Sequence, residues 1–527
     1  MQKKCFILLF FLLTVSSGFA QKEFYNWFFG QNATLTWSNT QNVNAGGAYG
    51  TPNAMLTGIP TAITPVSPKT QSPMSTMEGC FSVSDGNGNL MFFSDGITVW
   101  DKKWDPMPNA NPLLGTQMTG NPSSAQSGVI IPYPGNASKY IAITIGSQGA
   151  NNPASSVIDM TQRGGLGDVI ASTRNTPFLG GRGTMSESIT AVVAANRSDY
   201  WIVAPGRSAT SPSYLNVWKV TSAGVQNTAP SSVTSVNHIT TPMDVGGYIK
   251  FTPDAKHFAW IDYENRFFAY GDFNNTTGVI SNIRVRDGAL GTAFPAKEKG
   301  YGIEFTNDVK YMYLTYIDDR GINYSGLQVF DFNALLATST PNSVAPIKQL
   351  VNTGNLGYYH FGAIQKGPDG RMYITALVSS HIWVIDNPTD PTNMKIYTLN
   401  NILGSYIGRW GLPNFSTPWF KMLISSSTGT ECCSRTSASY RLEVIGGMGF
   451  DRVTKVVLSY GDGTSVTYNN PTLGIYTDTH IYDTPGLYTI TVTAYDSNGA
   501  VELSTTSQIK INSCVLRVNP HIRGINE

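Results

Sequence analysis

The stretch LSYGDGTSVTYNNPTLGIYTDTHIYDTPGLYTITVTAYDSNG, residues 458–499, decides how the C-terminal part of this chain folds. A tight Gly461-Asp462-Gly463 turn follows an apolar run, and Pro485-Gly486 makes a second corner. Between residues 489 and 494, Thr alternates with apolar Ile, Val and Ala. Alternation with a period of two beside Asp-Gly and Pro-Gly turns predicts half-buried strands of a small β-sandwich.

These residues resemble the PKD domain, an immunoglobulin-like β-sandwich of extracellular proteins. The matching positions are Tyr460, Gly461, Asp462, Gly463, His480, Tyr482, Pro485, Gly486, Tyr488, Asp496 and Gly499. The chain departs from the family at Leu458, where Trp is usual, and at Tyr460, which replaces Phe, but both keep an apolar inward residue. The resemblance covers residues 435–513. It implies a module that positions, extends or adheres and has no catalytic residues of its own.

The first twenty residues predict a secretory signal peptide. Lys3 and Lys4 precede an apolar core at residues 6–15, and small residues at 17–20 suit cleavage. The apolar core is too short to cross a bilayer, and no later stretch is long and apolar enough. We therefore expect an exported chain without a transmembrane segment, located in the periplasm, at the cell surface or outside the cell.

The charge balance argues against nucleic acid as a partner. Removal of two signal lysines lowers Lys+Arg from 35 to 33 against 34 acidic residues, so the mature net charge is about −1. A nearly neutral chain produces no long-range field for nucleic acid or anionic lipid. Charged residues are 13% of the chain, about half the usual share.

The cysteines predict one disulfide around the PKD-like segment. Cys432 and Cys433 precede this segment and Cys514 follows it, so a bridge from Cys432 or Cys433 to Cys514 would join its two ends. The alternative is that all three are free thiols. Cys80, between Gly79 and Phe81, is expected to be a small buried residue. No histidine lies at the spacing of a zinc site, so we expect no bound metal there.

Residues 21–425 carry a loose repeat. Short hydrophobic strands begin 50 to 60 residues apart, each after a turn, at residues 90–93, 140–143, 200–203, 257–260, 311–314 and 371–374. A repeat of this length, built from short strands and hairpins, predicts a β-propeller, with seven blades favoured over six or eight. A long β-sandwich or a β-helix is the alternative. We expect Trp27-Phe28-Phe29 and the stretch ending at Leu412-Pro413-Asn414-Phe415 to share one blade and close the ring.

The N-terminal region also resembles a propeller-like module of surface proteins that accompany type IX secretion and gliding motility. The matching stretches include Asn26–Gly30, Glu78–Cys80, Ser94–Trp100, Met107–Asn109, Gln126–Gly128, Gly164–Val169 and Gly411–Phe415. In that family PKD domains follow the propeller, as they do here. Its members usually end in a C-terminal sorting domain, whereas this chain ends soon after the PKD-like segment, which puts type IX export in doubt.

The predicted organisation is all-β: a propeller followed by an immunoglobulin-like sandwich. The boundaries are a signal peptide at 1–20, a propeller at 21–425, a linker at 426–434, the PKD-like domain at 435–513 and a tail at 514–527. Residues 40–75, rich in Gly, Pro, Ser and Thr, are expected to form a long loop.

Candidate sites for chemistry are weak. Asp85, Asn87 and Asn89 have the i, i+2, i+4 spacing of calcium ligands, but no Glu closes the loop, and hairpin turns select the same residues. A glycosidase would need two opposed carboxylates. The acids considered, most of them in predicted turns, are Asp85, Asp95, Glu187, Asp254, Glu304 and Asp369. No Ser-His-Asp grouping is visible, and we expect no catalytic residue and no cofactor.

Aromatic residues offer a binding surface. Five lie in predicted loops and are candidates for stacking against sugars or peptides, the alternative being that they pack in the core or at the rim: Trp104, Tyr248, Tyr358, Tyr359 and Trp410. The leading hypothesis is an exported, non-enzymatic interaction protein, an adhesin or surface-apparatus accessory, that binds protein or glycan through propeller loops. The alternatives are a polysaccharide hydrolase or lyase and a structural subunit of an envelope assembly. The sequence does not give the oligomeric state.

Overall fold

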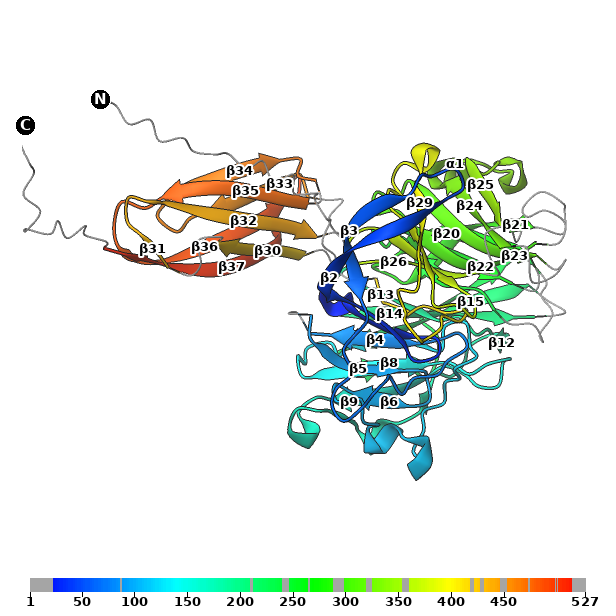
Figure 1. Cartoon of the computed structure of the whole chain (residues 1–527). Helices are drawn as coiled ribbons and strands as arrows, with labels where there is room; N and C mark the ends of the chain where they lie inside the picture. The colour runs from blue at the N-terminus through cyan, green and yellow to red at the C-terminus, as the bar shows by residue number, and fades with distance from the viewer. Residues whose placement is uncertain are drawn as a thin grey trace, which may run out of the picture. The chain divides into compact units, whose positions relative to one another are not determined.

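The computed structural model describes residues 22–513, except 86–87, 209–211, 239–245, 264–265, 288–297, 319–324, 353–359, 418–420, 427–430, 446–452, 473, 498 and 500. The described residues form two compact units, and the chain passes from the first to the second between Lys421 and Met422 (Figure 1). The expected signal peptide at 1–20 and tail at 514–527 lie outside the described residues, so both stay predictions.

The N-terminal unit consists of antiparallel sheets that follow one another along the chain. The first sheet contains β4 (Phe81–Ser84), β5 (Leu90–Ser94) and β6 (Val99–Asp101). The second contains β7 (Gly128–Pro132), β8 (Lys139–Thr144), β9 (Ala154–Asp159), β10 (Asp168–Val169) and β11 (Thr176–Pro177). The third contains β12 (Thr184–Met185), β13 (Thr190–Val193), β14 (Tyr200–Arg207), β15 (Ser213–Thr221), β16 (Gly224–Val225) and β17 (Ser232–Val236). Two four-stranded sheets follow: β18 (Ile249–Phe251), β19 (His257–Asp262), β20 (Phe267–Asn274) and β21 (Val279–Asp287), then β22 (Glu298–Phe305), β23 (Tyr311–Asp318), β24 (Ser325–Asp331) and β25 (Lys348–Asn352).

A seven-stranded sheet joins the two ends of this unit. It contains β1 (Asn26–Phe29), β2 (Ala33–Ala48), β3 (Ala54–Thr61), β26 (Phe361–Lys366), β27 (Met372–Ala376), β28 (Ile382–Ile385) and β29 (Ile396–Leu399). Helices are short: α1 (Phe332–Ala337) and the 3-10 turns η1 (Lys22–Phe24), η2 (Pro108–Ala110), η3 (Pro112–Leu114), η4 (Gln162–Gly164), η5 (Ala171–Thr173), η7 (Pro341–Ser343) and η8 (Pro391–Asn393).

The sheets follow one another around a ring, and their first strands touch. β4 contacts β7, β7 contacts β13, and the contacts continue through β18, β22 and β26, while β1 contacts β4. Apolar side chains fill the space between neighbouring sheets: Val129 and Ile131 of β7 share one buried cluster with Ile202 of β14 and Trp218 of β15. This is a β-propeller, as predicted. The number of blades stays a prediction, because β2 joins two groups of strands in one sheet.

A repeated hairpin explains the spacing seen in the sequence. After β18, the Thr252 hydroxyl donates to Asp254 and accepts the backbone N–H of His257. After β22, Thr306 donates to Asp308 and accepts the N–H of Tyr311 in the same way. The Asp side chain closes the turn, so this Thr-x-Asp pattern returns the chain into the next strand.

The two ends of the unit share one sheet, as expected. β1 pairs with β2, and β2 pairs with β29, so that Gly47 lies opposite Tyr397. Residues 412–415, which we expected in this blade, do not form a strand. The expected loop at 40–75 was also wrong in its first part, because β2 extends to Ala48 and β3 covers Ala54–Thr61.

The C-terminal unit has two sheets. One contains β30 (Lys421–Ser426), β32 (Ser437–Ile445) and β35 (Gly474–Ile481); the other contains β31 (Glu431–Cys433), β33 (Lys455–Ser459), β34 (Ser465–Asn469), β36 (Gly486–Tyr495) and β37 (Val501–Asn512). In β36 the alternation is as predicted, with Ile490, Val492 and Ala494 buried.

This unit begins earlier than expected. The predicted linker at 426–434 contains the end of β30 and all of β31, which pairs with β37. Its residues 427–430 lie outside the described part. Ser and Thr at 425–430 suggested a flexible linker, but strand pairing in the sandwich outweighs that local preference.

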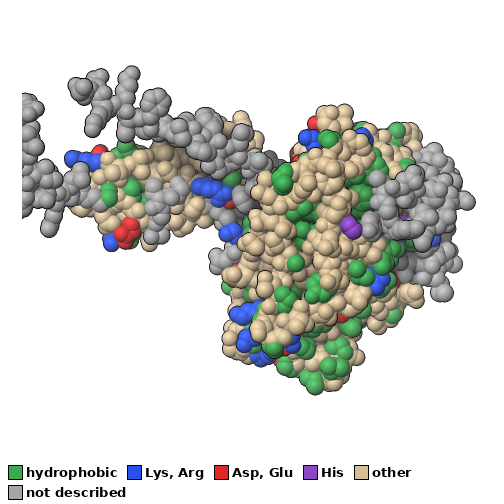
Figure 2. Space-filling view, viewed as in Figure 1, with side chains coloured by type: hydrophobic (Ala, Val, Ile, Leu, Met, Phe, Trp, Pro, Cys, Tyr) green, Lys and Arg blue, Asp and Glu red, His purple; other side chains and the backbone are tan. Residues whose placement is uncertain are grey.

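No helix among the described residues is both long and apolar enough to cross a membrane. Figure 2 shows that uncharged polar side chains and backbone make up most of the visible face of the N-terminal unit. This appearance agrees with a charged fraction of 13%.

Candidate functional site

Residues 408–417, which we call the crossing segment, run across the first strands of several sheets. Four backbone N–H groups of this segment donate to other parts of the chain: Gly408 to Ser379 O (2.7 Å), Trp410 to Met77 O (2.9 Å), Asn414 to Cys80 O (2.9 Å) and Thr417 to Ala191 O (2.9 Å). In addition, Trp410 O accepts the N–H of Ala363 (2.7 Å). The crossing segment therefore brings together parts of the chain that are far apart in sequence.

Asn414 anchors the crossing segment. Its amide nitrogen donates to Gly128 O (3.0 Å) and Ile189 O (2.8 Å), and its oxygen accepts from Gln126 Nε2 (3.1 Å). Only 2% of Asn414 is exposed. Gly411 is required nearby, because a Cβ there would lie 1.6 Å from the carbonyl oxygen of Glu78. The Gly-Leu-Pro-Asn-Phe stretch is thus a closure element, not a strand.

Two carboxylates with raised pKa values lie beside the crossing segment. Burial, and then repulsion from Glu187, raises the pKa of Glu78 to about 8, although Tyr301 donates to Glu78 Oε1 over 3.1 Å. Burial raises the pKa of Glu187 to about 7, against hydrogen bonds from the backbone N–H groups of Gln148 and Ala125. Glu187 is only 2% exposed, whereas Glu78 is partly exposed.

Aromatic rings lie on the side of Glu78, around Tyr301. Tyr301 is buried, and its ring lies 5.5 Å from Tyr248, 5.6 Å from Trp410 and 6.2 Å from Tyr263. Trp410 and Tyr263 keep part of their surface exposed. We call Glu78, Tyr248, Tyr263, Tyr301 and Trp410 the acid-aromatic cluster.

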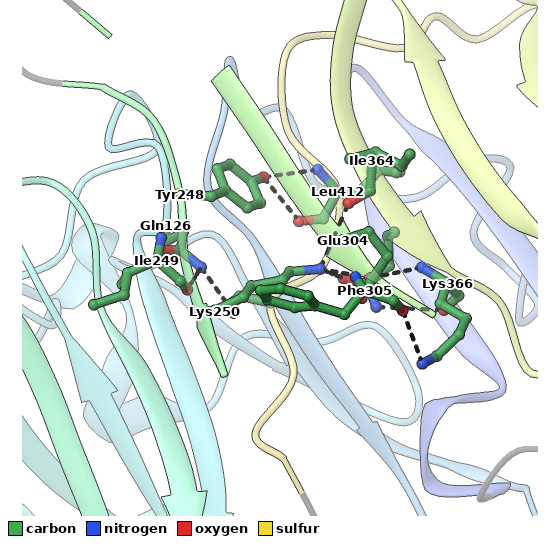
Figure 3. Close-up of polar contacts among 11 residues, drawn as sticks. Gln126, Tyr248, Ile249, Lys250, Glu304, Phe305, Ile364, Lys366 and Leu412 are labelled. Carbon is green, nitrogen blue, oxygen red and sulfur yellow. Dashed lines mark hydrogen bonds and ion pairs between the residues drawn. The ribbon is translucent and has the colours of Figure 1, made fainter. Parts of the chain in front are cut away.

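A second polar group links β18, β22 and β26 (Figure 3). Lys250 Nζ contacts Glu304 Oε2 and Gln365 Oε1, both at 2.7 Å, and Glu304 also accepts the backbone N–H of Lys366 (2.9 Å). Burial alone would raise the pKa of Glu304, but the charges of Lys250 and Lys366 outweigh it and lower the pKa. Burial lowers the pKa of Lys366. This network ties three consecutive sheets together.

The predicted aromatic surface is only partly correct. Trp104 and Tyr248 are each 1% exposed, so they belong to the core and cannot form an exposed stacking surface. Trp104 packs edge-on against Phe28, and the hydroxyl of Tyr248 bonds Leu412. Tyr358 and Tyr359 lie outside the described residues. Trp410 alone of the five is seen at a partly exposed position.

The other candidate acids serve their own turns. The carboxylate of Asp85 accepts hydrogen bonds from the backbone N–H and the side-chain NH2 of Asn89. The Asn89 side chain therefore turns its NH2 group, not the oxygen that would bind calcium, toward Asp85. Asn87 lies outside the described residues. Asp95 accepts the N–H groups of Ile97 and Thr98. The other candidates bond as follows: Asp254 to Thr252, and Asp369 to Arg371 and Tyr373.

Sequence reasoning missed Glu78 as a site residue. Glu187 was considered, but no local spacing in the sequence connects it with Glu78. Only the fold of the propeller brings the two carboxyl groups near enough to interact electrostatically. The Glu78-Gly79-Cys80 match to a surface-protein module was the one available signal.

The PKD motif residues of the C-terminal unit bond one another. Asp462 Oδ2 lies 2.6 Å from His480 Nε2, and the His480 ring stacks on Tyr460 at 4.1 Å. Tyr482 donates to Tyr460 O (3.0 Å). Burial alone would raise the pKa of Asp462, but Thr464 and His480 outweigh it and lower the pKa to about 2.

The remaining motif positions form its turns. Gly461 has a φ of +83°, and a Cβ there would meet Thr489 O at 2.5 Å. Gly463 also has a positive φ, Pro485 directly precedes Gly486 at the start of β36, and the Tyr488 hydroxyl bonds Thr484.

Cys433 is disulfide-bonded and Cys432 is free. Of the two alternatives left open by the sequence, Cys433 is therefore the bridged residue. The expected partner, Cys514, lies outside the described residues, two positions beyond Asn512, which pairs with Cys433. Cys80 is free and buried, as expected.

Comparison with known proteins identifies the C-terminal unit. Residues 433–509 match the family model of the PKD domain. The chain contains a PKD domain. No curated protein matches the chain.

Several solved structures are similar to this chain. A PKD domain of an M14-like peptidase from a Thermoplasmatales archaeon has 15% identity and a TM-score of 0.15, covering 18% of this chain and 93% of its own. A protein proposed to be a 6-phosphogluconolactonase from Bacteroides uniformis has 11% identity and a TM-score of 0.36, covering 82% and 96%. The Dos1 propeller has 11% identity and a TM-score of 0.29, covering 73% and 84%.

Proposed function

We propose that this chain is an exported recognition protein of the cell surface that binds a protein or glycan through one end of its propeller. The PKD domain at residues 433–509 carries this proposal, because such domains are typical of extracellular proteins. The PKD domain then acts as a spacer or second contact. The finer role, as adhesin or accessory of a type IX surface apparatus, rests on the stretches of sequence similar to that module.

The state of the polar residues supports binding over catalysis. Asp85, Asp95 and Asp254 are engaged in their own turns, and Glu304 is neutralised by Lys250. Partly exposed aromatic rings beside a carboxyl group, as in the acid-aromatic cluster, are typical of recognition sites.

Protease shaving of intact cells tests the location. The proposal predicts that added protease removes the chain from intact cells while a cytoplasmic marker survives. Protection of the chain until the cells are lysed would rule out the surface location. Membrane-permeabilised cells serve as the control that shows the chain is cleavable.

A polysaccharide hydrolase is the second candidate, and the Glu78 and Glu187 pair favours it. Glycoside hydrolysis uses one carboxyl group with a raised pKa as the acid and a second, ionised carboxylate as base or nucleophile, and the pKa values of Glu78 and Glu187, about 8 and about 7, would assign Glu78 as the acid. A hydrolase would release reducing ends from a polysaccharide, and Glu78→Gln would abolish the release. The burial of Glu187, with both of its oxygens bonded to backbone N–H groups, argues against this candidate.

A further inference from the structure

We propose that Glu78, Tyr301 and Trp410 form a subsite for one uncharged sugar ring of a glycan chain. This inference rests on the proposed recognition function and names the ligand class for one end of the propeller. It commits to a neutral glycan in preference to an amine or a peptide.

The three residues are held in fixed positions by contacts from different parts of the chain. Trp410 N donates to Met77 O over 2.9 Å, and the Trp410 ring lies 5.6 Å from the ring of Tyr301. The close approach of Gly411 to the Glu78 carbonyl excludes any larger residue at that point. Tyr301 comes from β22 and donates to Glu78 Oε1 over 3.1 Å. A site built on such fixed backbone needs little ordering when a ligand binds.

Two polar atoms of this group stay available. Among the residues that the structure describes, Glu78 Oε2 and the indole nitrogen of Trp410 have no hydrogen-bond partner. Both atoms lack a partner without being buried, so both are accessible to solvent. Tyr301 below them is 2% exposed, whereas Trp410 and Glu78 are partly exposed. The surface thus offers a carboxyl oxygen and an N–H donor beside an aromatic ring.

The chemistry of this group suits sugar hydroxyls. A sugar ring presents an apolar face that packs on an aromatic ring and hydroxyls that both donate and accept. With a pKa of about 8, Glu78 is mostly protonated at pH 7. It then attracts a cation little, but it can both donate to and accept from a hydroxyl. A neutral hydroxylated ligand therefore fits this carboxyl group better than an ammonium group.

Calorimetric titration of the full mature chain tests the subsite. The probes are neutral hexasaccharides (cellohexaose, xylohexaose, laminarihexaose, mannohexaose and chitohexaose), with a glucosamine hexamer and a galacturonic acid hexamer as charged counterparts. We expect at least one neutral probe to bind. Trp410→Ala and Glu78→Ala should each weaken its binding at least about tenfold, because truncating a central contact typically costs that much.

Glu78→Gln keeps a donor and an acceptor and should weaken binding less than Glu78→Ala. Tyr311→Ala, a partly exposed aromatic at the hairpin that follows β22, is the matched control and should bind as the wild type does. If Trp410→Ala does not fold, as judged by circular dichroism, Trp410→Phe keeps an aromatic ring but removes the N–H donor and the second ring of the indole, and it should still weaken binding.

Three results would overturn the subsite. These are no binding of any neutral hexasaccharide, binding unchanged in Trp410→Ala and Glu78→Ala, or preferential binding of the glucosamine hexamer. None of them affects the surface location, which protease shaving tests separately, so the failure of this inference and of the proposed function can be told apart.

Discussion

Buried carboxyl groups in this protein have opposite charge states, and their nearest charged neighbours decide which. Glu304 lies against Lys250 and Lys366, and its pKa is lowered even though it is buried. For Glu78, burial and then repulsion from a second acid, Glu187, raise the pKa to about 8. Burial penalises the charged form in both cases, and at Glu304 the two lysines outweigh that penalty.

Glu78→Gln should make the propeller more stable at alkaline pH. Because the pKa of Glu78 is raised in the folded state, its protonated form contributes to the stability of the fold, and this contribution is complete below the ordinary pKa of 4.5. The contribution is lost as pH rises through about 8, where the folded protein must ionise Glu78. Gln does not ionise and avoids the loss. Thermal unfolding should therefore give a higher Tm for the variant at pH 9 and a similar Tm at pH 4.5. A wild-type Tm equal to the variant's at pH 9 would contradict the assignment.

Lys250→Met should destabilise the propeller by about 3–5 kcal/mol, because it leaves Glu304 buried without its closest cation. Chemical denaturation at pH 7 measures the free energy of unfolding. Lys395→Met, at an exposed position, is the control and should change it by less than about 0.5 kcal/mol. Equal effects of the two substitutions would mean that the network in Figure 3 contributes nothing specific.

Among the elements, the crossing segment does most to join the sheets. It has no regular secondary structure, yet its hydrogen bonds reach Met77, Cys80, Ala191 and Ala363. Gly411 allows its close approach to the backbone of Glu78. An irregular element can be buried in this way because its polar groups are paired.

Asn414→Ala should lower the stability of the propeller by at least about 1–3 kcal/mol, since it leaves the buried carbonyls of Gly128 and Ile189 without their donor. Asn227→Ala removes a single exposed hydrogen bond to Pro177 O and is the matched control. The midpoint of denaturation for each variant checks the difference. A loss no larger than that of the control would show that Asn414 is not an anchor.

Local patterns predicted the elements better than their partners. The alternation at 489–494 and the Thr-x-Asp hairpins at 252–254 and 306–308 are dictated by neighbouring residues, so strands and turns were visible in the sequence. The pairing of β2 with β29 depends on residues about 350 positions apart, which no local period records.

The same limit applies to the site. Loop position suggested that Trp104 and Tyr248 are exposed, but ring closure buries both in the core. Glu78 was missed because its raised pKa depends on Glu187, which only the fold brings near. Trp410 was a candidate because it is an aromatic residue in a predicted loop, and the structure leaves it partly exposed.

At the scale of the whole molecule, the chain has two compact units with separate cores. The propeller rests on packing between sheets, whereas the PKD domain is small and also uses the Cys433 disulfide. Small domains depend more on such bridges because they bury less apolar surface.

Cys433→Ser should destabilise the PKD domain by about 2–5 kcal/mol and leave the propeller unchanged. Calorimetry of the full chain should show one transition shifted to lower temperature and one unaltered. Cys432→Ser, which removes the free thiol, is the control and should shift neither. A shift of both transitions would mean that the two units do not unfold independently.

The most direct test of this account is a disulfide across the seam of the ring. Ala48 on β2 and Ile396 on β29 are directly opposite in the register, a geometry that a disulfide can bridge. We predict that Ala48→Cys/Ile396→Cys forms an intramolecular bond, seen by mass spectrometry and by faster migration on a non-reducing gel, whereas the misaligned pair Ala48→Cys/Leu399→Cys does not. Absence of the bond in the aligned pair, or bonds only between chains, would contradict a ring closed by its own two ends.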